Sequence, residues 1–356
     1  MAMIFNNYWA DYFWSYWGRL QRFDRTSNYG NQTIDVRCAF EPWSIPEPFR
    51  AFPKPISAMV FDSRHRRWND MCHARIWSDR VPQRGLVQIA DEAFVVSPEF
   101  LFLEFARRFD LPQTIALGYE LCGTYSINPL TGRALFNLPP ITTAAKLKRF
   151  VMDAGSVHGA KRARTASCYV CNNSASPMET SLHMHYQLPR RLHGFALSGS
   201  TMNKSVPLNE RAQLLYPHQT CRCDILYPKT HRAIEYYGRF HCYQMEGDFG
   251  RVAALKVMRY DTTVLTYDEY NNLWALGEIA NTIAREQGIY MKRGNIEPTE
   301  GRQRLHESLR LYCEGYGRKP EGLDEESLEL AIEYMRQEGV FLKELPWSRQ
   351  IEIGAF

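Results

Sequence analysis

Several features that would assign a protein to a familiar class are missing from this sequence. No run approaches the roughly 18 apolar residues that a membrane-spanning helix needs, so no association with a membrane is expected. Residues 1–17 lack both a basic stretch and a small-residue cleavage site, and they therefore do not predict a signal peptide. Glycine-rich phosphate loops, dinucleotide signatures and serine-hydrolase elbows are also absent, which excludes the enzymes recognised by those motifs.

Cysteine is present, but it does not form a regular pattern. The nine cysteines are an odd number without even spacing, which indicates a reducing compartment and a cytoplasmic protein. Cys168 and Cys171 form one close pair, and Cys221 and Cys223 form another. A zinc ribbon needs two knuckle-like pairs, whereas alternate residues of a strand stand roughly 6.5 Å apart. Buried free thiols are therefore preferred to a zinc site.

The composition is that of a globular protein with a slight basic bias. The 356 residues are enough for two domains or for one elaborated domain. The net charge of +4 permits nucleic acid as a partner but does not require it.

The most informative stretch begins with two short apolar runs, Cys223–Tyr227 and Ala233–Tyr237. The polar, proline-containing break between them predicts a β-hairpin. A turn centred on that break places Asp224 directly opposite Glu235. Opposite side chains stand about 4.5–5.5 Å apart at Cβ, and two carboxylates that close repel unless a proton or a cation relieves them. The hairpin therefore predicts a Mg2+ or Mn2+ site, with a solvated sheet face as the alternative.

A helix and a further strand are predicted after the hairpin. Apolar residues recur at helical spacing across 246–258, and the β-branched run Thr262–Tyr267 favours a buried strand. These elements carry Asp224, Glu235-Tyr-Tyr-Gly238, His241, Asp248, Arg251, Val264-Leu-Thr266 and Asp268. In order and spacing they resemble the Vsr-like branch of the PD-(D/E)XK nuclease superfamily.

The resemblance covers residues 174–273 and implies an α/β fold. Its core would be restriction-endonuclease-like, with helices flanking a mixed sheet. The implied activity is metal-dependent hydrolysis of phosphodiester bonds in DNA, with Mg2+ or Mn2+ as the cofactor. Asp224 and Glu235 would hold the metal, and the carbonyl of Tyr236 would add a ligand.

Further residues have roles implied by the same resemblance. His241 is the candidate proton shuttle, and Arg251 or Lys256 would supply positive charge. Glu179 follows Ser176 by three residues, so it completes a capping box at the start of a helix. The resemblance equally implies that Glu179 is a third acid at the metal, and both interpretations stay open.

The resemblance leaves two function classes open. The first is an active DNA endonuclease, which the presence of both ligand carboxylates favours. The second is a nuclease-like fold without cleavage that regulates by binding DNA or protein, as in phage defence or a toxin–antitoxin pair. Tyr237 favours the second class, because it stands where the superfamily has Lys and carries no positive charge at neutral pH.

The segment before residue 174 is predicted to be α+β. Short strands are expected near residues 58–61, 73–77 and 86–90, and helices begin at Ser97 and at 111. Two further helices make the most basic region of the chain, which is either a nucleic-acid face or a solvated surface. Its basic residues are Lys146, Lys148, Arg149, Lys161, Arg162 and Arg164. The run Arg64-His65-Arg66-Arg67 is predicted to be a loop with the same two interpretations.

The two ends of the chain complete the division into four segments, 1–56, 57–173, 174–273 and 274–356. Eight aromatic residues lie between Phe5 and Trp17 and form a helical stripe, which packs on this chain or a twin subunit, or meets another partner. Residues 272–288, 299–315 and 324–339 are predicted to be helices. The C-terminal helices are expected either to pack on the nuclease-like core or to pair protomers, so a homodimer through the aromatic N-terminus or through these helices is one of the assemblies that the sequence permits.

Overall fold

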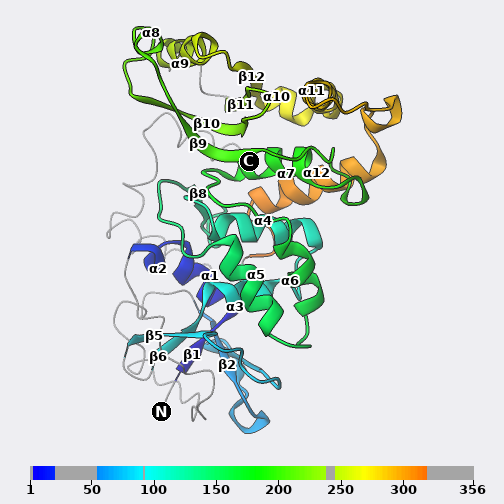
Figure 1. Ribbon diagram of the computed structural model, residues 1–356. Helices are drawn as coiled ribbons and strands as arrows, with labels where there is room; N and C mark the ends of the chain where they lie inside the picture. The colour runs from blue at the N-terminus through cyan, green and yellow to red at the C-terminus, as the bar shows by residue number, and fades with distance from the viewer. Residues whose placement is uncertain (1–2, 21–53, 91–92, 238–244, 319–356) are drawn as a thin grey trace. The chain divides into compact units, whose positions relative to one another are not determined.

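The computed structural model describes residues 3–20, 54–90, 93–237 and 245–318, without the side chains of 245–248. It confirms the mixed α/β class. The described residues divide into two compact units (Figure 1), one of residues up to Val170 with 312–318, the other of Cys171–Leu311. These units are coarser than the four predicted segments, which stay a prediction. None of the described helices is both long and apolar enough to cross a membrane.

The first unit is built on a six-stranded mixed sheet. Its strands lie in the order β3-β4-β2-β1-β6-β5, so that the first three residues of the described chain occupy the interior of the sheet. β1 pairs antiparallel with β2 and parallel with β6. The strands are β1 Met3–Phe5, β2 Ile56–Val60, β3 Trp68–Asn69, β4 Cys72–Ile76, β5 Leu86–Ala90 and β6 Ala93–Val96, with a separate pair β7 Ser126–Ile127 and β8 Ala134–Leu135.

The aromatic N-terminus packs within its own chain. After β1, the helix α1 spans Asn7–Ser15 and α2 spans Trp17–Leu20. Every residue of α1 is buried, and Trp14 donates from its indole nitrogen to the Val96 carbonyl at 2.8 Å. The predicted packing on this chain's own body is therefore confirmed. The aromatic residues of α1 offer no exposed face for the predicted dimer contact through this stripe, which stays a prediction.

Three of the next four helices of the first unit begin at a side-chain cap, including the one predicted at Ser97, and the fourth begins after Gly159 without one. Ser97 accepts from the amide of Phe100, and Asp110 forms a full capping box with Gln113. Thr143 caps the third helix by accepting from Lys146. A side-chain oxygen thereby satisfies an amide that has no partner within the helix. The helices are α3 Pro98–Phe105, α4 Leu111–Leu121, α5 Ala144–Asp153 and α6 Ala160–Ser167.

The second unit holds a four-stranded sheet in the order β12-β11-β10-β9. β10 pairs antiparallel with both β9 and β11, whereas β11 pairs parallel with β12 across the connecting helix α9. The predicted order of strand, turn, strand, helix, strand is confirmed. The strands are β9 Thr201–Pro207, β10 Thr220–Tyr227, β11 Arg232–Tyr237 and β12 Asp261–Thr266. The helices are α7 Pro177–Gln187, α8 Glu210–Gln213, α9 Met245–Val257, α10 Tyr267–Asn271, α11 Leu273–Glu286 and α12 Glu300–Cys313, with short 3-10 turns at Ser63–His65, Arg190–Leu192 and Arg293–Asn295.

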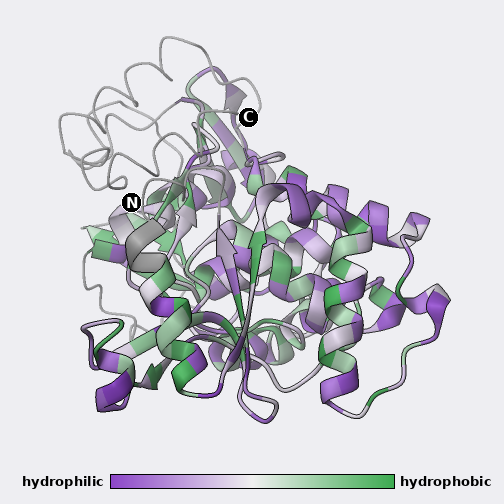
Figure 2. Ribbon diagram, turned by 90° about the horizontal axis from the view of Figure 1, so that it is seen from above, coloured by the Kyte–Doolittle hydropathy of each residue, from purple (hydrophilic) through white to green (hydrophobic). Residues whose placement is uncertain are grey.

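Each face of this second sheet has its own core. Residues of α7 and α11 pack on one face, which includes Ile225 and Ile234. Residues of α8 and α9 pack on the other face, which includes Leu226 and Ala233. Figure 2 shows purple and green bands along the helices, and in α11 the buried residues recur at helical spacing as a single stripe. The predicted helices at 272–288 and 299–315 are confirmed, and 324–339 lies outside the described residues.

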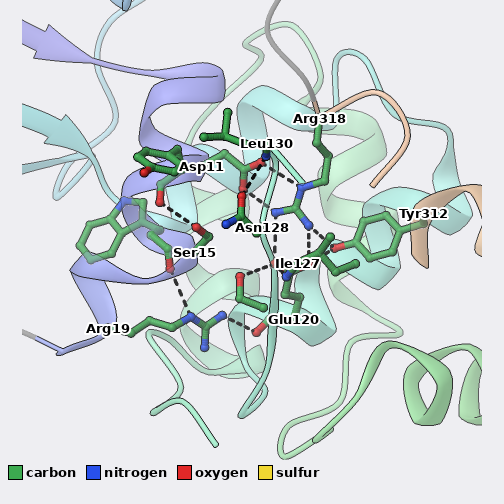
Figure 3. Close-up of polar contacts among 12 residues, drawn as sticks. Asp11, Ser15, Arg19, Glu120, Ile127, Asn128, Leu130, Tyr312 and Arg318 are labelled. Atoms are coloured by element: carbon green, nitrogen blue, oxygen red, sulfur yellow. Dashed lines mark hydrogen bonds and ion pairs between the residues drawn. The ribbon is translucent and has the colours of Figure 1, made fainter. Parts of the chain in front are cut away.

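A buried ion cluster closes the first unit (Figure 3). The Arg318 guanidinium contacts the carboxylate of Asp11 at 2.6 Å and that of Glu120 at 2.6 Å. Burial opposes ionisation of Glu120, but Arg318, the Tyr312 hydroxyl and the Ile127 amide outweigh it, so its pKa lies below the ordinary value. Asp11 lacks those extra donors, and burial raises its pKa. All three charged side chains are nearly inaccessible to water.

We expect Arg318→Met to destabilise the first unit strongly, because it leaves two buried carboxylates without their cation. Removing one partner of a buried ion pair costs about 3–5 kcal/mol. The measurement is the midpoint of urea unfolding. The control is Arg304→Met, whose partner Glu300 is 80% exposed, and which should leave the midpoint nearly unchanged. Equal effects of the two substitutions would contradict a structural role for the cluster.

Candidate metal-binding site

The predicted hairpin register is confirmed. β10 and β11 pair Ile225 with Ile234 and Leu226 with Ala233, and one step further along this register Asp224 lies opposite Glu235. The ladder itself ends at Ile225. Beyond it, the Asp224 carboxylate accepts from the backbone amide of Tyr236 at 2.9 Å. A side chain therefore takes the place of a backbone acceptor at the point where the two strands stop pairing.

Side-chain alternation along β10 is interrupted at this residue. Cys223 belongs to the core beneath α9, whereas Ile225, two positions on, belongs to the core beneath α7. In a regular strand these two residues would share a face. The neighbouring strand is also irregular here, because Asn203 adopts a positive φ of 50°. The rule that opposite residues share a face consequently does not apply at Asp224.

Glu235 is paired with a cation from the protein itself. Its side chain has 0% exposure and forms an ion pair with Arg251 of α9. Ala233, two positions earlier, lies in the α9 core, so regular alternation accounts for the direction of Glu235. The prediction that Asp224 and Glu235 grip one cation between them is corrected by this pairing, since Arg251 already supplies the positive charge.

Asp224 lies instead within electrostatic reach of Glu179. Burial and, to a smaller extent, the negative charge of Asp224 raise the pKa of Glu179 to about 7, although hydrogen bonds from Asn203 and Ala175 oppose the shift. Glu179 comes from the first turn of α7, where Ser176 accepts from its amide at 3.0 Å. Its carboxylate reaches back to the amide of Ala175 at 3.1 Å, one residue earlier than a standard capping box.

Two polar residues that the sequence interpretation missed complete this group. Asn203 donates to Oε2 of Glu179 at 2.5 Å and accepts from Nε of Arg222 at 2.7 Å. It lies on β9 between the residues that pair with Cys223 and Ile225, at the point opposite Asp224 where the pairing is interrupted. Strand β9 was not predicted, because its sequence TMNKSVP has no apolar alternation. The one sequence signal for an irregularity in this strand is Asn203 itself, because Asn adopts a positive φ more readily than most residues.

The donor set fits a divalent cation in part. No three His, Cys, Asp or Glu side chains among the described residues are placed to hold one ion, so the predicted trio with Glu235 is not formed. Mg2+ is commonly held by one or two carboxylates, with waters and phosphate oxygens completing its shell. Glu179 and Asp224 provide such a pair, and a cation between them would relieve the repulsion that raises the pKa of Glu179.

The remaining predicted residues have different outcomes. The amide of Tyr236 is tied to Asp224, and the role of its carbonyl as a ligand stays a prediction. Lys256 is exposed on α9, five positions from Arg251 and hence on another side of the helix, so the two are not interchangeable. Tyr237 is half-buried. His241 lies outside the described residues.

The predicted basic face belongs to the first unit, and only part of it is available. Arg162 donates to the carbonyls of Ala106 at 3.0 Å and Phe109 at 2.5 Å. Arg164 donates to the carbonyls of Val151 and Gly155. These two arginines therefore satisfy carbonyls near the ends of α3 and α5, and their assignment as nucleic-acid contacts stays a prediction. Arg164 is half-buried, whereas Lys146, Lys148, Arg149, Lys161 and Arg162 are exposed.

Within the described parts of the chain, the histidines and cysteines are not gathered at a metal site. His183 and His185 are both fully buried, one bonded to Ser200 and the other to His306, as expected of packing residues. All seven cysteines in the described ranges are free thiols. Burial was predicted correctly for Cys221 and Cys223 but wrongly for Cys168 and Cys171, which are exposed and half-buried.

Comparison of the chain with protein-family models, with curated proteins and with solved structures finds no match. The geometry of Glu179, Asp224 and their neighbours therefore carries the functional argument together with the sequence resemblance.

We expect Glu179→Gln to remove a pH dependence of stability. A carboxyl group whose pKa is about 7 in the folded state and about 4.5 when unfolded binds more protons when folded, so its contribution falls as pH rises between those values. Urea midpoints measured without divalent ions should therefore favour the variant increasingly from pH 5 to pH 8.

The control is Glu307→Gln on α12. A hydrogen bond from Arg310 holds the pKa of Glu307 below its ordinary value, so its effect should be constant across this pH range. A wild type and a Glu179→Gln variant with parallel pH profiles would show that Glu179 titrates normally.

Proposed function

We propose that the second unit is the core of a metal-dependent nuclease of the Vsr-like, restriction-endonuclease-like type, which hydrolyses phosphodiester bonds in DNA. The single observation that carries the proposal is the pairing of Glu179 with Asp224. The buried Glu179 of α7 and the half-buried Asp224 of β10 lie close enough for the charge of Asp224 to add to the effect of burial on the pKa of Glu179. A carboxyl group perturbed by burial and by a neighbouring acid is typical of sites that bind a cation or move a proton.

The element order supports the same proposal. The sheet places β10, β11 and β12 in the predicted succession, and α7 precedes the sheet with a glutamate in its first turn. When bound, Mg2+ or Mn2+ would lower the pKa of a water and neutralise charge on the scissile phosphate. Glu179 and Asp224 are the residues that would hold it.

The neighbouring residues have supporting tasks. Asn203 fixes one carboxylate oxygen of Glu179, and the Tyr236 amide fixes one of Asp224, so both acids are oriented before any ligand arrives. Arg222 is exposed on the same strand as Asp224 and supplies positive charge for a phosphate. In the hydrolysis the attacking water gives one proton to solvent, and its oxygen bonds to phosphorus as the bond to the leaving oxygen breaks. His241 is the proposed donor of the proton that the leaving oxygen takes up.

A second candidate is a nuclease-like fold that binds nucleic acid or protein without cutting. The observation that favours it is the ion pair of Glu235 with Arg251, which neutralises the acid that the superfamily pattern assigns to the metal. Tyr237 favours it as well, because it replaces the lysine that in the superfamily would stabilise the negative charge developing on the phosphate.

The test is cleavage of plasmid and single-stranded DNA in Mg2+ or Mn2+. We expect wild type to cut and Asp224→Asn and Glu179→Gln to lose cleavage, since each removes a charge needed to hold the cation. Asn203→Ala should lower the rate about 10- to 100-fold, the usual size for a residue that orients a metal ligand. The matched control is Glu307→Gln, an exposed acid outside the site that should cut normally.

Calorimetric titration with Mn2+ separates the two candidates. A nuclease should bind the ion in wild type and lose binding in Asp224→Asn. DNA binding that persists without cleavage or metal binding, unchanged in both acid variants, would support the regulator and contradict the nuclease.

A further inference from the structure

The outer edge of the sheet in the first unit carries an exposed aromatic side chain. Trp68 lies on β3, the outermost strand on that side, and 51% of its side chain is exposed. Three other tryptophans of this unit, Trp9, Trp14 and Trp77, are at most 4% exposed. Burial of a large apolar ring is favourable, so packing alone does not account for leaving this one in water.

The exposed indole is nevertheless held in a fixed position. Its ring stacks on His73 of β4 with a centroid distance of 4.0 Å and an interplanar angle of 9°. The Arg75 guanidinium carbon lies 5.2 Å from the centroid of the same ring. His73 is the direct cross-strand partner of Trp68, so the backbone ladder itself sets the stack.

Positive charge surrounds this aromatic group. Residues 62–76 contain four arginines and two aspartates, and the loop before β3 supplies Arg64, Arg66 and Arg67. One of the two acids is already engaged, because Asp62 accepts from the amides of Arg64 and His65 and pairs with the His65 ring. The Arg67 guanidinium donates to the carbonyls of Arg64 and Arg66 and thereby holds the loop together.

This combination matches the chemistry of an unpaired nucleic-acid strand. Arginines contact phosphates, and an exposed aromatic ring stacks on a base whatever its sequence. A duplex hides the faces of its bases within the helix, so it offers the phosphates but not the stack. An acidic peptide would likewise use the arginines and leave the indole unused.

We propose that the β3–β4 edge and the loop 63–67 bind single-stranded nucleic acid. Trp68, fixed by His73, stacks on a base, and Arg64, Arg66 and Arg75 lie beside the phosphates. The site belongs to the first unit and does not depend on the proposed nuclease function of the second.

The test is fluorescence anisotropy of the full chain in EDTA, with labelled single strands of about 20 nucleotides in DNA and in RNA and a duplex of the same length. We expect both single strands to bind more tightly than the duplex, and the two arms to show which sugar is preferred. Trp68→Ala should weaken binding to single strands about 5- to 150-fold, the range of one base–aromatic stack. Arg66→Gln should reduce the slope of log affinity against log salt by about 0.7.

Two further variants identify the cause. Trp68→Phe keeps an aromatic ring and should bind nearly as well as wild type. The matched control is Trp274→Ala on α11 of the second unit, where 49% of the side chain is exposed and no ring stack is present among the described residues. It should leave binding unchanged.

The proposal is overturned if Trp68→Ala binds like wild type, or if Trp68→Phe and Trp68→Ala are equally weak. Binding of the duplex as tight as that of single strands, or equal competition by polyglutamate, would show a surface that recognises charge alone and would also overturn it.

Discussion

A carboxylate removed from water must be given a cation or hydrogen-bond donors, and this constraint organises both units. Asp11 and Glu120 share Arg318, and Glu235 has Arg251. Among the described residues Glu179 has no such cation; it receives hydrogen bonds from Asn203 and Ala175 and keeps a raised pKa. Glu104 in the first unit is satisfied in the same way, by Asn6 and Asn7, and burial also raises its pKa to about 7. Glu179 differs from Glu104 in having a second acid nearby, because the negative charge of Asp224 adds to the effect of burial.

Local chemistry predicted most of the elements in the second unit. The position of the proline-containing turn predicted the hairpin register, and the apolar pattern supports it, since a slip of one residue would turn the apolar side chains to the other face. A serine cap predicted where α7 begins, as another did for α3 in the first unit. The side chains that Asp224 and Glu235 contact were not predictable, because they depend on an irregularity of the strands that sequence patterns do not reveal. The positive φ of Asn203 coincides with the broken alternation at Asp224, and the acid is then directed toward Tyr236 and Glu179.

The basic residues illustrate a second limit of sequence interpretation. Residue type shows that Arg162 and Lys161 are positively charged, but not which carbonyls lie nearby. Both side chains are exposed, but Arg162 also donates to two carbonyls beyond the end of α3. Strand β1 was missed for a similar reason, because a three-residue strand buried on both faces has no periodicity of its own. In each case the decisive neighbour is distant in the chain.

The position of Arg318 has a consequence for biosynthesis. The described part of the first unit begins with β1 and ends with residues 312–318, so residues 171–311 of the second unit are translated between its two parts. A ribosome must therefore release residues 171–311 before the carboxylates of Asp11 and Glu120 meet their guanidinium. Until then the nascent first unit holds two buried acids without their counter-charge, and the inserted unit has the opportunity to fold first.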